Sequence, residues 1–381
     1  MAITSFSNSR AVLLDGIVDI TAISIIDGMI EEIPDNAVAE ATANFEGLTV
    51  FPGFIDVHIH GAMGEDVNSA DADGLLTVAA FLAENGVTAW MPTLVPDSDA
   101  NYRRAINAID ELMRRQVGMP VAQAVGVHYE GVFASRVMCG ALRPEYFKTF
   151  TGPEINELPR LENGIHMMTL APEVAGGIEL IEELVKHEWI VSIGHTAADT
   201  ETLDRAFDAG ARHMTHFFNA MTGIHHRDIG VAGWGLANRD VTFDIIADGI
   251  HVHPKMLDLA FRSKTPEKVL LISDSVAPTG LGDGQYELWG EKVSVKSGRT
   301  QNERGSIAGS VSTMFDGVRM FRSLGFSDID IEKMASSNPA RLLGLDKERG
   351  SIEIGKRADI VGLDADANVS FTMIGGRMAE K

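Results

Sequence analysis

The chain has 381 residues, and its 54 acidic residues outnumber its 32 lysines and arginines, which gives a formal net charge of −22. A negative charge of this size repels polyanions, so it argues against nucleic acid or an anionic membrane surface as a partner. Hydrophobic residues make up 45% of the chain, too many for a disordered protein. At this length we expect about two domains, or one large barrel with a small partner domain.

Cysteine use and the amino-terminal segment indicate the compartment. The single cysteine, Cys139, excludes a framework of internal disulfides and is typical of a reducing environment. Residues 1–16 lack the apolar run of a secretory signal, and no window approaches the 18 apolar residues of a membrane span. We therefore expect a cytoplasmic protein that does not cross a membrane.

The two ends of the chain have the same β-rich texture. Short runs with β-branched residues, broken by Asp-Gly and Glu-Gly pairs, fill residues 10–50, and similar runs return in the last part of the chain. Neither end contains enough strands to be stable alone. We predict a small β-sandwich domain built from residues 1–51 and 347–381, beside a central catalytic domain of residues 52–346.

The central domain alternates strand-like and helix-like segments. Eight apolar strand-like runs occur, at residues 54–59, 87–94, 121–131, 166–173, 189–195, 211–219, 241–249 and 268–274. Helix-like segments lie between most of them, at residues 71–86, 99–116, 153–161, 177–188, 199–210 and 254–263. This alternation implies parallel pairing, and eight such units predict the α/β class and a closed (β/α)8 TIM-like barrel.

Such a barrel carries its chemistry on the loops that follow the carboxyl ends of its strands. Titratable residues occupy those positions in six of the eight units, namely His58, His60, Glu130, His195, His216, Asp248, His251 and Asp274. His58 and His60 are two residues apart on one strand, so their imidazoles point to the same side. A His-x-His pair alone is more often an ordinary hydrogen-bonded pair. Together with a carboxylate and further strand-end histidines, it favours a zinc or iron site.

These residues carry a family resemblance. The segment PGFIDVHIHG (52–61) resembles the one that opens the barrel of the amidohydrolase superfamily. The segments that follow it in order look like the successive motifs of N-acetylglucosamine-6-phosphate deacetylases: HYEGVF (128–133), GHT (194–196), HFFNAMTGIHHR (216–227), DGIH (248–251), SDS (273–275) and IAGS (307–310). The likeness runs through nearly the whole chain, including the closing GKRADIV segment.

The resemblance implies roles for these positions. Glu130, His195 and His216 match the main metal ligands, and His58 and His60 match a second metal site that some relatives lack. It implies one or two divalent ions per subunit, with zinc as first choice and iron, manganese or cobalt as alternatives. Asp274 is the catalytic residue, the general base and then the general acid, in this interpretation.

The resemblance also implies a substrate and a partner. The ligand is a phosphorylated N-acetyl amino sugar, contacted by Asn219, Ala220, Arg227, His251, Ala141, Ile307, Ala308 and Gly309. Arg227 and His251 are implied to serve the site of a neighbouring subunit, so we expect a homodimer.

One departure from the family pattern concerns the loop of residues 139–147. Relatives commonly carry a histidine at the position of Leu142, where it helps to polarise the acetyl carbonyl. Leucine cannot donate a hydrogen bond, and losing such a donor typically lowers the rate by about 10² to 10³. Three explanations stay open: a second metal at His58 and His60 takes over, Arg143 moves in, or the substrate differs.

The leading hypothesis is metal-dependent deacetylation of an N-acetyl-hexosamine 6-phosphate, with the gluco epimer first and the galacto epimer second. One alternative is another amidohydrolase that acts on a different N-acyl substrate. The other is a catalytically weakened, sugar-phosphate-binding paralogue, with Leu142 as a sign of decay. The intact ligand set and Asp274 favour an enzyme.

Overall fold

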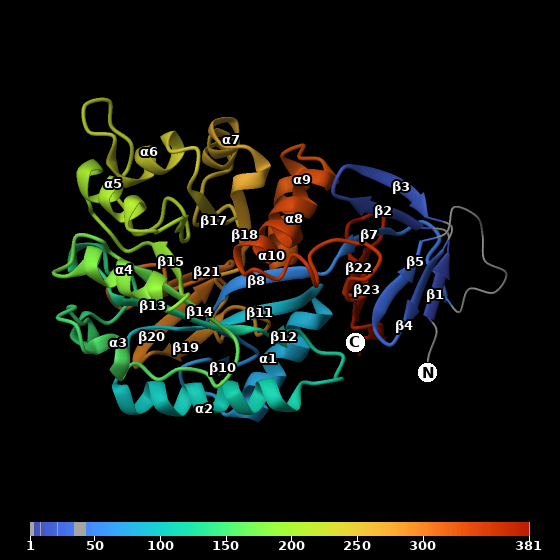
Figure 1. Ribbon diagram of the computed structural model, residues 1–381, viewed down its shortest axis with the longest axis horizontal. Helices are drawn as coiled ribbons and strands as arrows, with labels where there is room; N and C mark the ends of the chain where they lie inside the picture. The colour runs from blue at the N-terminus through green and yellow to red at the C-terminus, as the bar shows by residue number, and fades with distance from the viewer. Residues whose placement is uncertain (1–3, 8, 21, 34–42, 381) are drawn as a thin grey trace.

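The computed structural model describes residues 4–7, 9–20, 22–33 and 43–380. A barrel with helices around it forms the larger part, and a small two-sheet unit lies at one end of it (Figure 1). In the stretches named above, no helix is long and apolar enough to cross a membrane.

Eight parallel strands form the barrel, as the alternation predicted. Their order around the sheet is β8, β11, β13, β14, β15, β16, β17 and β18. Their bounds are β8 Phe54–Ile59, β11 Val87–Leu94, β13 Gly126–Phe133, β14 Ile165–Leu170, β15 Ile190–Ile193, β16 His213–Met214, β17 Thr242–Ile246 and β18 Val269–Ile272. The last strand meets the first where the Asp274 amide donates to the His58 carbonyl at 3.0 Å. The barrel prediction is confirmed.

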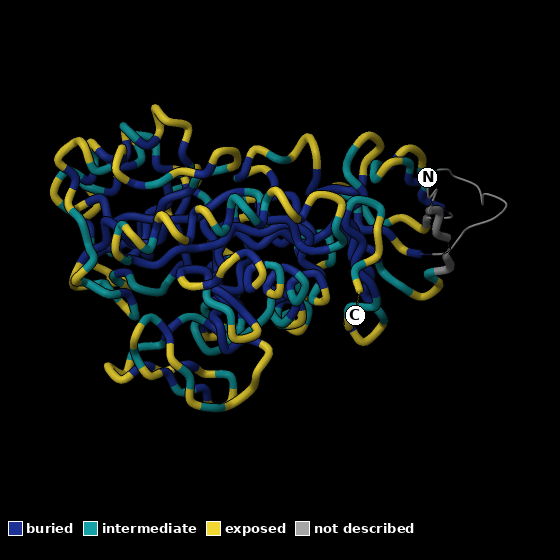
Figure 2. Tube along the Cα trace, turned by 90° about the horizontal axis from the view of Figure 1, so that it is seen from below, coloured by how far each residue is buried: buried dark blue, intermediate teal, exposed yellow. Residues whose placement is uncertain are grey.

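Helices surround the strands, and the longer ones bury apolar side chains. They are α1 Ala72–Glu84, α2 Asp99–Arg115, α3 Glu154–Glu157, α4 Gly177–Lys186, α5 Thr200–Asp208, α6 Gly230–Ala237, α7 Pro254–Ser263, α8 Met314–Ser323, α9 Asp328–Glu332 and α10 Asn338–Leu342. In α2, Tyr102, Ile106 and Ile109 are buried at helical spacing, while Arg103 and Arg104 are exposed. Figure 2 shows this pattern for the barrel as a whole, with buried strands inside an exposed rim.

Two sequence predictions about elements were wrong in length. The helix expected at 153–161 is only α3, because Leu158 precedes Pro159 and adopts an extended backbone (φ −67°, ψ 124°). The strand expected at 211–219 is only β16, because the backbone turns at His216, whose φ is +30°. The turn places His216 at the barrel mouth.

The small unit combines strands from both ends of the chain in two sheets. One has the order β5-β4-β1-β6 and the other β24-β23-β22-β7-β2-β3. Their bounds are β1 Thr4–Ser7, β2 Ser9–Leu13, β3 Gly16–Ile20, β4 Ile23–Ile26, β5 Met29–Glu32, β6 Ala43–Asn44, β7 Thr49–Pro52, β22 Ile360–Leu363, β23 Val369–Ile374 and β24 Arg377–Met378. Buried side chains from both ends, among them Ile23, Ile25, Ile360 and Met373, form one shared core. The domain bounds of 1–51 plus 347–381 remain a prediction.

A further small sheet follows β18, and the sequence did not predict it. It is an antiparallel meander of β19 Gly284–Leu288, β20 Glu291–Lys296 and β21 Arg299–Asn302. A turn at Trp289 and Gly290 joins its first two strands. Trp289 reaches the barrel mouth, where its ring centroid lies 5.4 Å from that of His60.

Candidate active site

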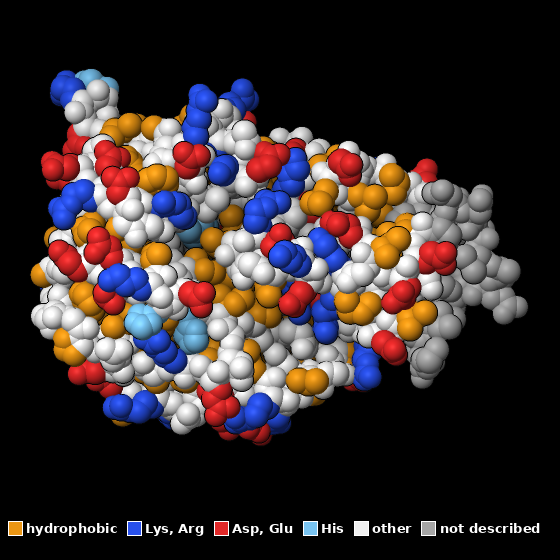
Figure 3. Space-filling view, in the orientation of Figure 1, with side chains coloured by type: hydrophobic (Ala, Val, Ile, Leu, Met, Phe, Trp, Pro, Cys, Tyr) orange, Lys and Arg blue, Asp and Glu red, His pale blue; other side chains and the backbone are white. Residues whose placement is uncertain are grey.

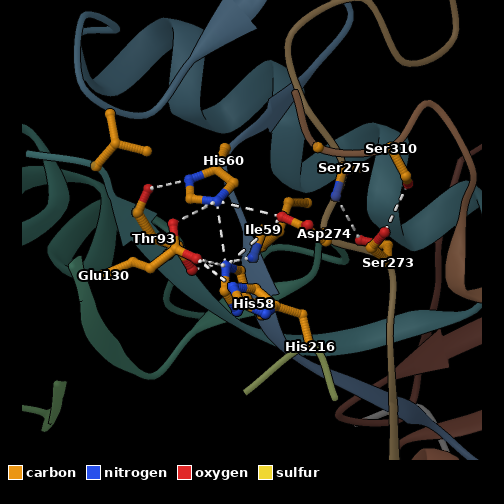
Figure 4. A network of polar contacts seen from close by, with 12 residues as sticks. His58, Ile59, His60, Thr93, Glu130, His216, Ser273, Asp274, Ser275 and Ser310 are labelled. Carbon is orange, nitrogen blue, oxygen red and sulfur yellow. Dashed lines mark hydrogen bonds and ion pairs between the residues drawn. The ribbon is translucent and has the colours of Figure 1, made fainter. Parts of the chain in front are cut away.

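Two groups of buried ligand-type side chains meet at the carboxyl ends of the barrel strands. His58, His60 and Asp274 form one group, and Glu130, His195 and His216 form the other. A Glu130 oxygen lies 3.3 Å from His58 Nε2, so the groups adjoin. Figure 4 shows side chains of both groups turned toward one another from β8, β13 and the ends of β16 and β18. The sequence prediction of six converging residues agrees with this geometry.

The backbone at the strand ends is strained. His195, His216 and Asp274 have φ values of +48°, +30° and +50°, in the left-handed region that non-glycine residues rarely adopt. Each such residue costs on the order of 1–3 kcal/mol unless its surroundings enforce it, and such residues cluster at functional sites. Here the left-handed backbone conformation turns the three side chains inward at the barrel mouth.

The imidazoles are fixed so that their Nε2 atoms face the centre. Nδ1 of His195 lies 2.9 Å from the Met138 carbonyl, and Nδ1 of His58 lies 2.9 Å from Thr215 Oγ1. Two pairs of Nε2 atoms then approach each other, at 3.0 Å for His195 with His216 and 3.1 Å for His58 with His60. At most one proton can lie between two such nitrogens, whereas a cation can be shared by both. The donor set of imidazoles and carboxylates fits a divalent metal.

Burial and neighbouring groups shift the pKa values of the residues at the mouth in opposite directions. Burial raises the pKa of Glu130, but the charge of His58 and hydrogen bonds from His195 and His216 outweigh burial and hold it well below its usual range. Burial lowers the pKa of His60, but contacts with Asp274 and Glu130 raise it to about 10. Carboxylates therefore stay ionised although buried, and their charge attracts protons or a cation to the ring nitrogens.

A second layer of polar residues supports the ligands. Asp244 on β17 accepts from the His216 amide and lies 2.9 Å from His213 Nε2. Thr215 Oγ1 lies between Asp244, at 3.3 Å, and His58. Sequence reasoning missed Asp244, although a lone aspartate inside the otherwise apolar run TFDII was a usable signal. Supporting groups of this kind fix the orientation of metal ligands.

Several other histidines have structural surroundings. His128 is buried and stacks edge-on against His58 with ring centroids 4.7 Å apart, as expected for a supporting residue. His253 caps α7 by accepting from the Lys255 amide.

A cavity of about 300 Å³ opens beside the two ligand groups. Its lining contains members of both groups and also Gly140, Ala141, Leu142, Asn219, Ala220, His251, Trp289, Ser306, Ile307 and Gly309. A larger hollow of about 710 Å³ lies by the small two-sheet unit and is lined by residues such as Arg10, Thr49 and Arg322. None of the six ligand-type residues lines that larger hollow, so the smaller cavity is the site.

Most of the predicted substrate residues line the cavity, but not all of them do. Asn219, Ala220, Ala141, Ile307 and Gly309 line the cavity as expected. Ala308 is buried and its amide donates to Thr300 Oγ1, so its placement does not support the predicted contact with substrate.

The two residues expected to serve a neighbouring site lie in different places. His251 lines the cavity of its own chain, and its Nδ1 lies 2.7 Å from Asp248 Oδ2. A role for it in a neighbouring site stays a prediction. Arg227 is exposed beside His226 on the segment that precedes α6, outside the cavity lining. That segment protrudes from the barrel in Figure 1, and the matching corner of Figure 3 carries basic and histidine side chains.

Arg143 does not point at the reacting centre. Its guanidinium pairs with Asp97 at 2.8 Å and donates to the Pro96 carbonyl. In this arrangement Arg143 does not substitute for the histidine that relatives carry at position 142, and it would have to leave Asp97 to do so. Leu142 itself is buried at the cavity wall.

Comparisons with known proteins define the class. Residues 49–379 match the amidohydrolase family, so the chain belongs to that family and is a hydrolase of amide C–N bonds.

Within it, the chain is similar to two groups of relatives. It is 37% identical to N-acetylglucosamine-6-phosphate deacetylase of Bacillus subtilis, over 87% of this chain and 84% of the relative. It is 35% identical to N-acetylgalactosamine-6-phosphate deacetylase of Escherichia coli O157:H7, over 97% of both chains. A mutant N-acetyl-D-glucosamine-6-phosphate deacetylase of Mycobacterium smegmatis, in complex with N-acetyl-D-glucosamine-6-phosphate, superposes with a TM-score of 0.90 at 28% identity over both full chains.

Proposed function

We propose that this chain hydrolyses the acetamide of an N-acetyl-hexosamine 6-phosphate, giving acetate and the amino sugar 6-phosphate. N-acetylglucosamine 6-phosphate is the first candidate, and the galacto epimer is the second, because relatives of both kinds align along most of the chain. The observation that carries the proposal is the meeting of Asp274 with two ligand groups in one substrate-sized cavity.

Asp274 is the proposed proton carrier. Burial raises its pKa, but the charges of His58 and His60 and a hydrogen bond from His60 outweigh burial and keep it below the usual value. It is therefore a carboxylate that can take a proton from the attacking water and later deliver it to the amine nitrogen. Water oxygen bonds to the acyl carbon, the C–N bond breaks, and the nitrogen leaves with that proton.

The ligand groups would hold one or two divalent ions, and we propose zinc as the native metal, with iron, manganese and cobalt as alternatives. Such an ion, when bound, lowers the pKa of a water ligand to roughly 7 and polarises the carbonyl. Glu130, His195 and His216 would hold the first ion, and His58 and His60 the second. Within each group the ligand atoms lie close together, and the Glu130 carboxylate lies within 3.3 Å of Nε2 of His195, His216 and His60.

Part of the cavity lining is the proposed sugar-phosphate site. The Asn219 side chain, the His251 ring and the backbone near Ala220, Ile307 and Gly309 would contact the sugar. We propose a cytoplasmic homodimer in which Arg227, on its protruding loop, binds the phosphate in the neighbouring subunit. The single cysteine supports the reducing compartment.

A deacetylation screen tests the proposal. Purified protein loaded with zinc or iron is given N-acetyl hexosamines with and without the 6-phosphate, and acetate is measured. We expect turnover of the phosphorylated sugars and a large loss of apparent substrate affinity in Arg227→Ala. Arg239→Ala, which changes another exposed arginine, is the control. Equal turnover of sugars with and without phosphate would contradict the proposed substrate class.

A further inference from the structure

The lining of the active-site cavity combines polar and apolar side chains. Asn219, whose backbone amide donates to the His216 carbonyl at 2.9 Å, and His251 contribute polar groups. Leu142 and Trp289 contribute apolar surface. Such a lining suits a ligand that has one polar and one apolar part.

Leu142 and Trp289 adjoin the ligand groups directly. Leu142 lies against Gly131, the residue after Glu130, so closely that a Cβ on Gly131 would come within 2.3 Å of Leu142 Cδ1. The Trp289 ring meets His60 edge-on, with centroids 5.4 Å apart. Trp289 also packs against the buried cluster that contains Leu142. The two side chains therefore flank the Glu130–His60 contact, where a reacting carbonyl would lie.

Trp289 occupies a backbone position that its side chain disfavours. In the two-residue turn between β19 and β20, Trp289 has φ +53° and Gly290 has φ +81°. Two-residue turns with positive φ at both positions strongly prefer Asn-Gly or Asp-Gly, and a bulky residue there is an outlier. Trp289 Nε1 donates to Asp66 Oδ2 at 2.9 Å, which fixes the ring toward the cavity. Observed strain of this kind indicates a functional constraint.

The same small sheet holds Leu142 in place. Arg304, which follows β21, donates through its Nη2 to the Ala141 carbonyl at 2.8 Å and to the Leu142 carbonyl at 3.3 Å. Its Nε lies 3.0 Å from Glu291 Oε1, so the guanidinium is itself oriented by β20. The sheet of β19, β20 and β21 therefore positions both apolar side chains, as a cavity wall of fixed shape requires.

We propose that Leu142 and Trp289 form the subsite for the acyl group of the amide and limit its length. The inference rests on the proposed function, in which the sugar lies toward Asn219 and His251. The acyl substituent leaves the carbonyl carbon on the side opposite the nitrogen, and therefore meets the apolar wall. Leu142 cannot donate a hydrogen bond to the carbonyl. Its role is to select a short saturated acyl group by shape.

The test compares acyl lengths on metal-loaded enzyme. N-acetyl, N-propanoyl and N-butanoyl glucosamine 6-phosphates are supplied, and the released carboxylic acids are followed by NMR. One methylene in an apolar pocket is worth about 10- to 200-fold in kcat/KM. We expect wild type to prefer acetyl to butanoyl by at least about 10-fold. Leu142→Ala should reduce that preference by about 10-fold or more.

Two further variants keep the test decisive. Trp289→Phe replaces the indole by a smaller ring and should reduce the preference for the acetyl group, as Leu142→Ala does. It therefore tests the subsite even if Leu142→Ala does not fold. Val137→Ala removes similar bulk from the same loop where the side chain is 77% exposed, and its acyl preference should equal that of wild type.

The outcomes separate the two proposals. If wild type releases acetate but the acyl preference of Leu142→Ala and Trp289→Phe stays within twofold of wild type, the subsite is wrong and the deacetylase activity stands. If wild type releases no acid from any of the three compounds, the proposed function is wrong and the subsite with it.

Discussion

The two ends of the barrel use the same strands for different purposes. Below the mouth and toward the amino end, buried apolar side chains from several strands, among them Ile55, Met91 and Met167, form one cluster with Ala340 of α10. At the carboxyl end, the same sheet carries buried histidines and carboxylates on strained backbone. Stability is therefore concentrated at one end and chemistry at the other, as is general for (β/α) barrels. Substitutions at each end should move different measurements.

The largest expected effect is at the carboxyl end. Asp274→Asn should lower kcat by about 10² to 10⁴, because the amide cannot accept and return the proton. Elemental analysis of the same samples gives their metal content. It shows how much of the fall in kcat is due to lost metal. A variant that keeps kcat within tenfold of wild type would exclude Asp274 as the proton carrier.

The opposite result is expected at the amino end. Met91 is fully buried in the apolar cluster, so Met91→Ala should lower the free energy of unfolding by about 2–5 kcal/mol. Its kcat, per bound metal, should stay within about twofold. Met378→Ala is the matched control, since this side chain is 44% exposed and its loss should cost about 0.5 kcal/mol or less. If Met91→Ala lowers kcat without lowering the free energy of unfolding, the assignment of stability to one end and chemistry to the other is wrong.

A residue behind the ligands should give an intermediate effect. Asp244→Asn removes the charge that orients His213, Thr215 and the His216 amide. We expect metal affinity to fall by about 10- to 100-fold, measured by competition with a chelating dye. Unchanged affinity would mean that these contacts do not orient the ligands.

A last prediction concerns a pH-dependent exception at the amino end. Glu332 precedes the π-helical turn Lys333–Ser337, is fully buried, and accepts from Ser337 Oγ at 3.2 Å. Burial raises its pKa to about 8, so the folded state keeps a proton that the unfolded state releases near pH 4.5.

The sign of the pH effect follows from that difference. Relative to Glu332→Gln, wild type should lose stability as pH rises from about 4.5 to 8, by up to about 1.4 kcal/mol per pH unit, with a constant difference outside that window. Denaturant unfolding of both proteins at several pH values measures it. Parallel curves across the window would show that Glu332 does not bind a proton on folding.

The sequence predicted much of this site because ligand residues recur at strand ends. His58 and His60 share a strand with period two, and the barrel rule brings them to Glu130, His195, His216 and Asp274. Other features depend on contacts that no local pattern records. Trp289 enters the cavity from a sheet missed in the sequence, and Arg304 holds a loop 162 residues away in the chain. The placement of His251 in its own cavity likewise depends on the path of the loop after β17.

The central claim is that the carboxyl end of the barrel deacetylates a hexosamine 6-phosphate. Its most direct test is to follow metal-loaded wild type with N-acetylglucosamine 6-phosphate by proton NMR, beside Asp274→Asn at matched metal content. We predict that acetate and glucosamine 6-phosphate appear in equal amounts with wild type, and at least about 10² times more slowly with the variant. Equal rates for both proteins, or no acetate from wild type with this sugar and its galacto epimer, would contradict the account.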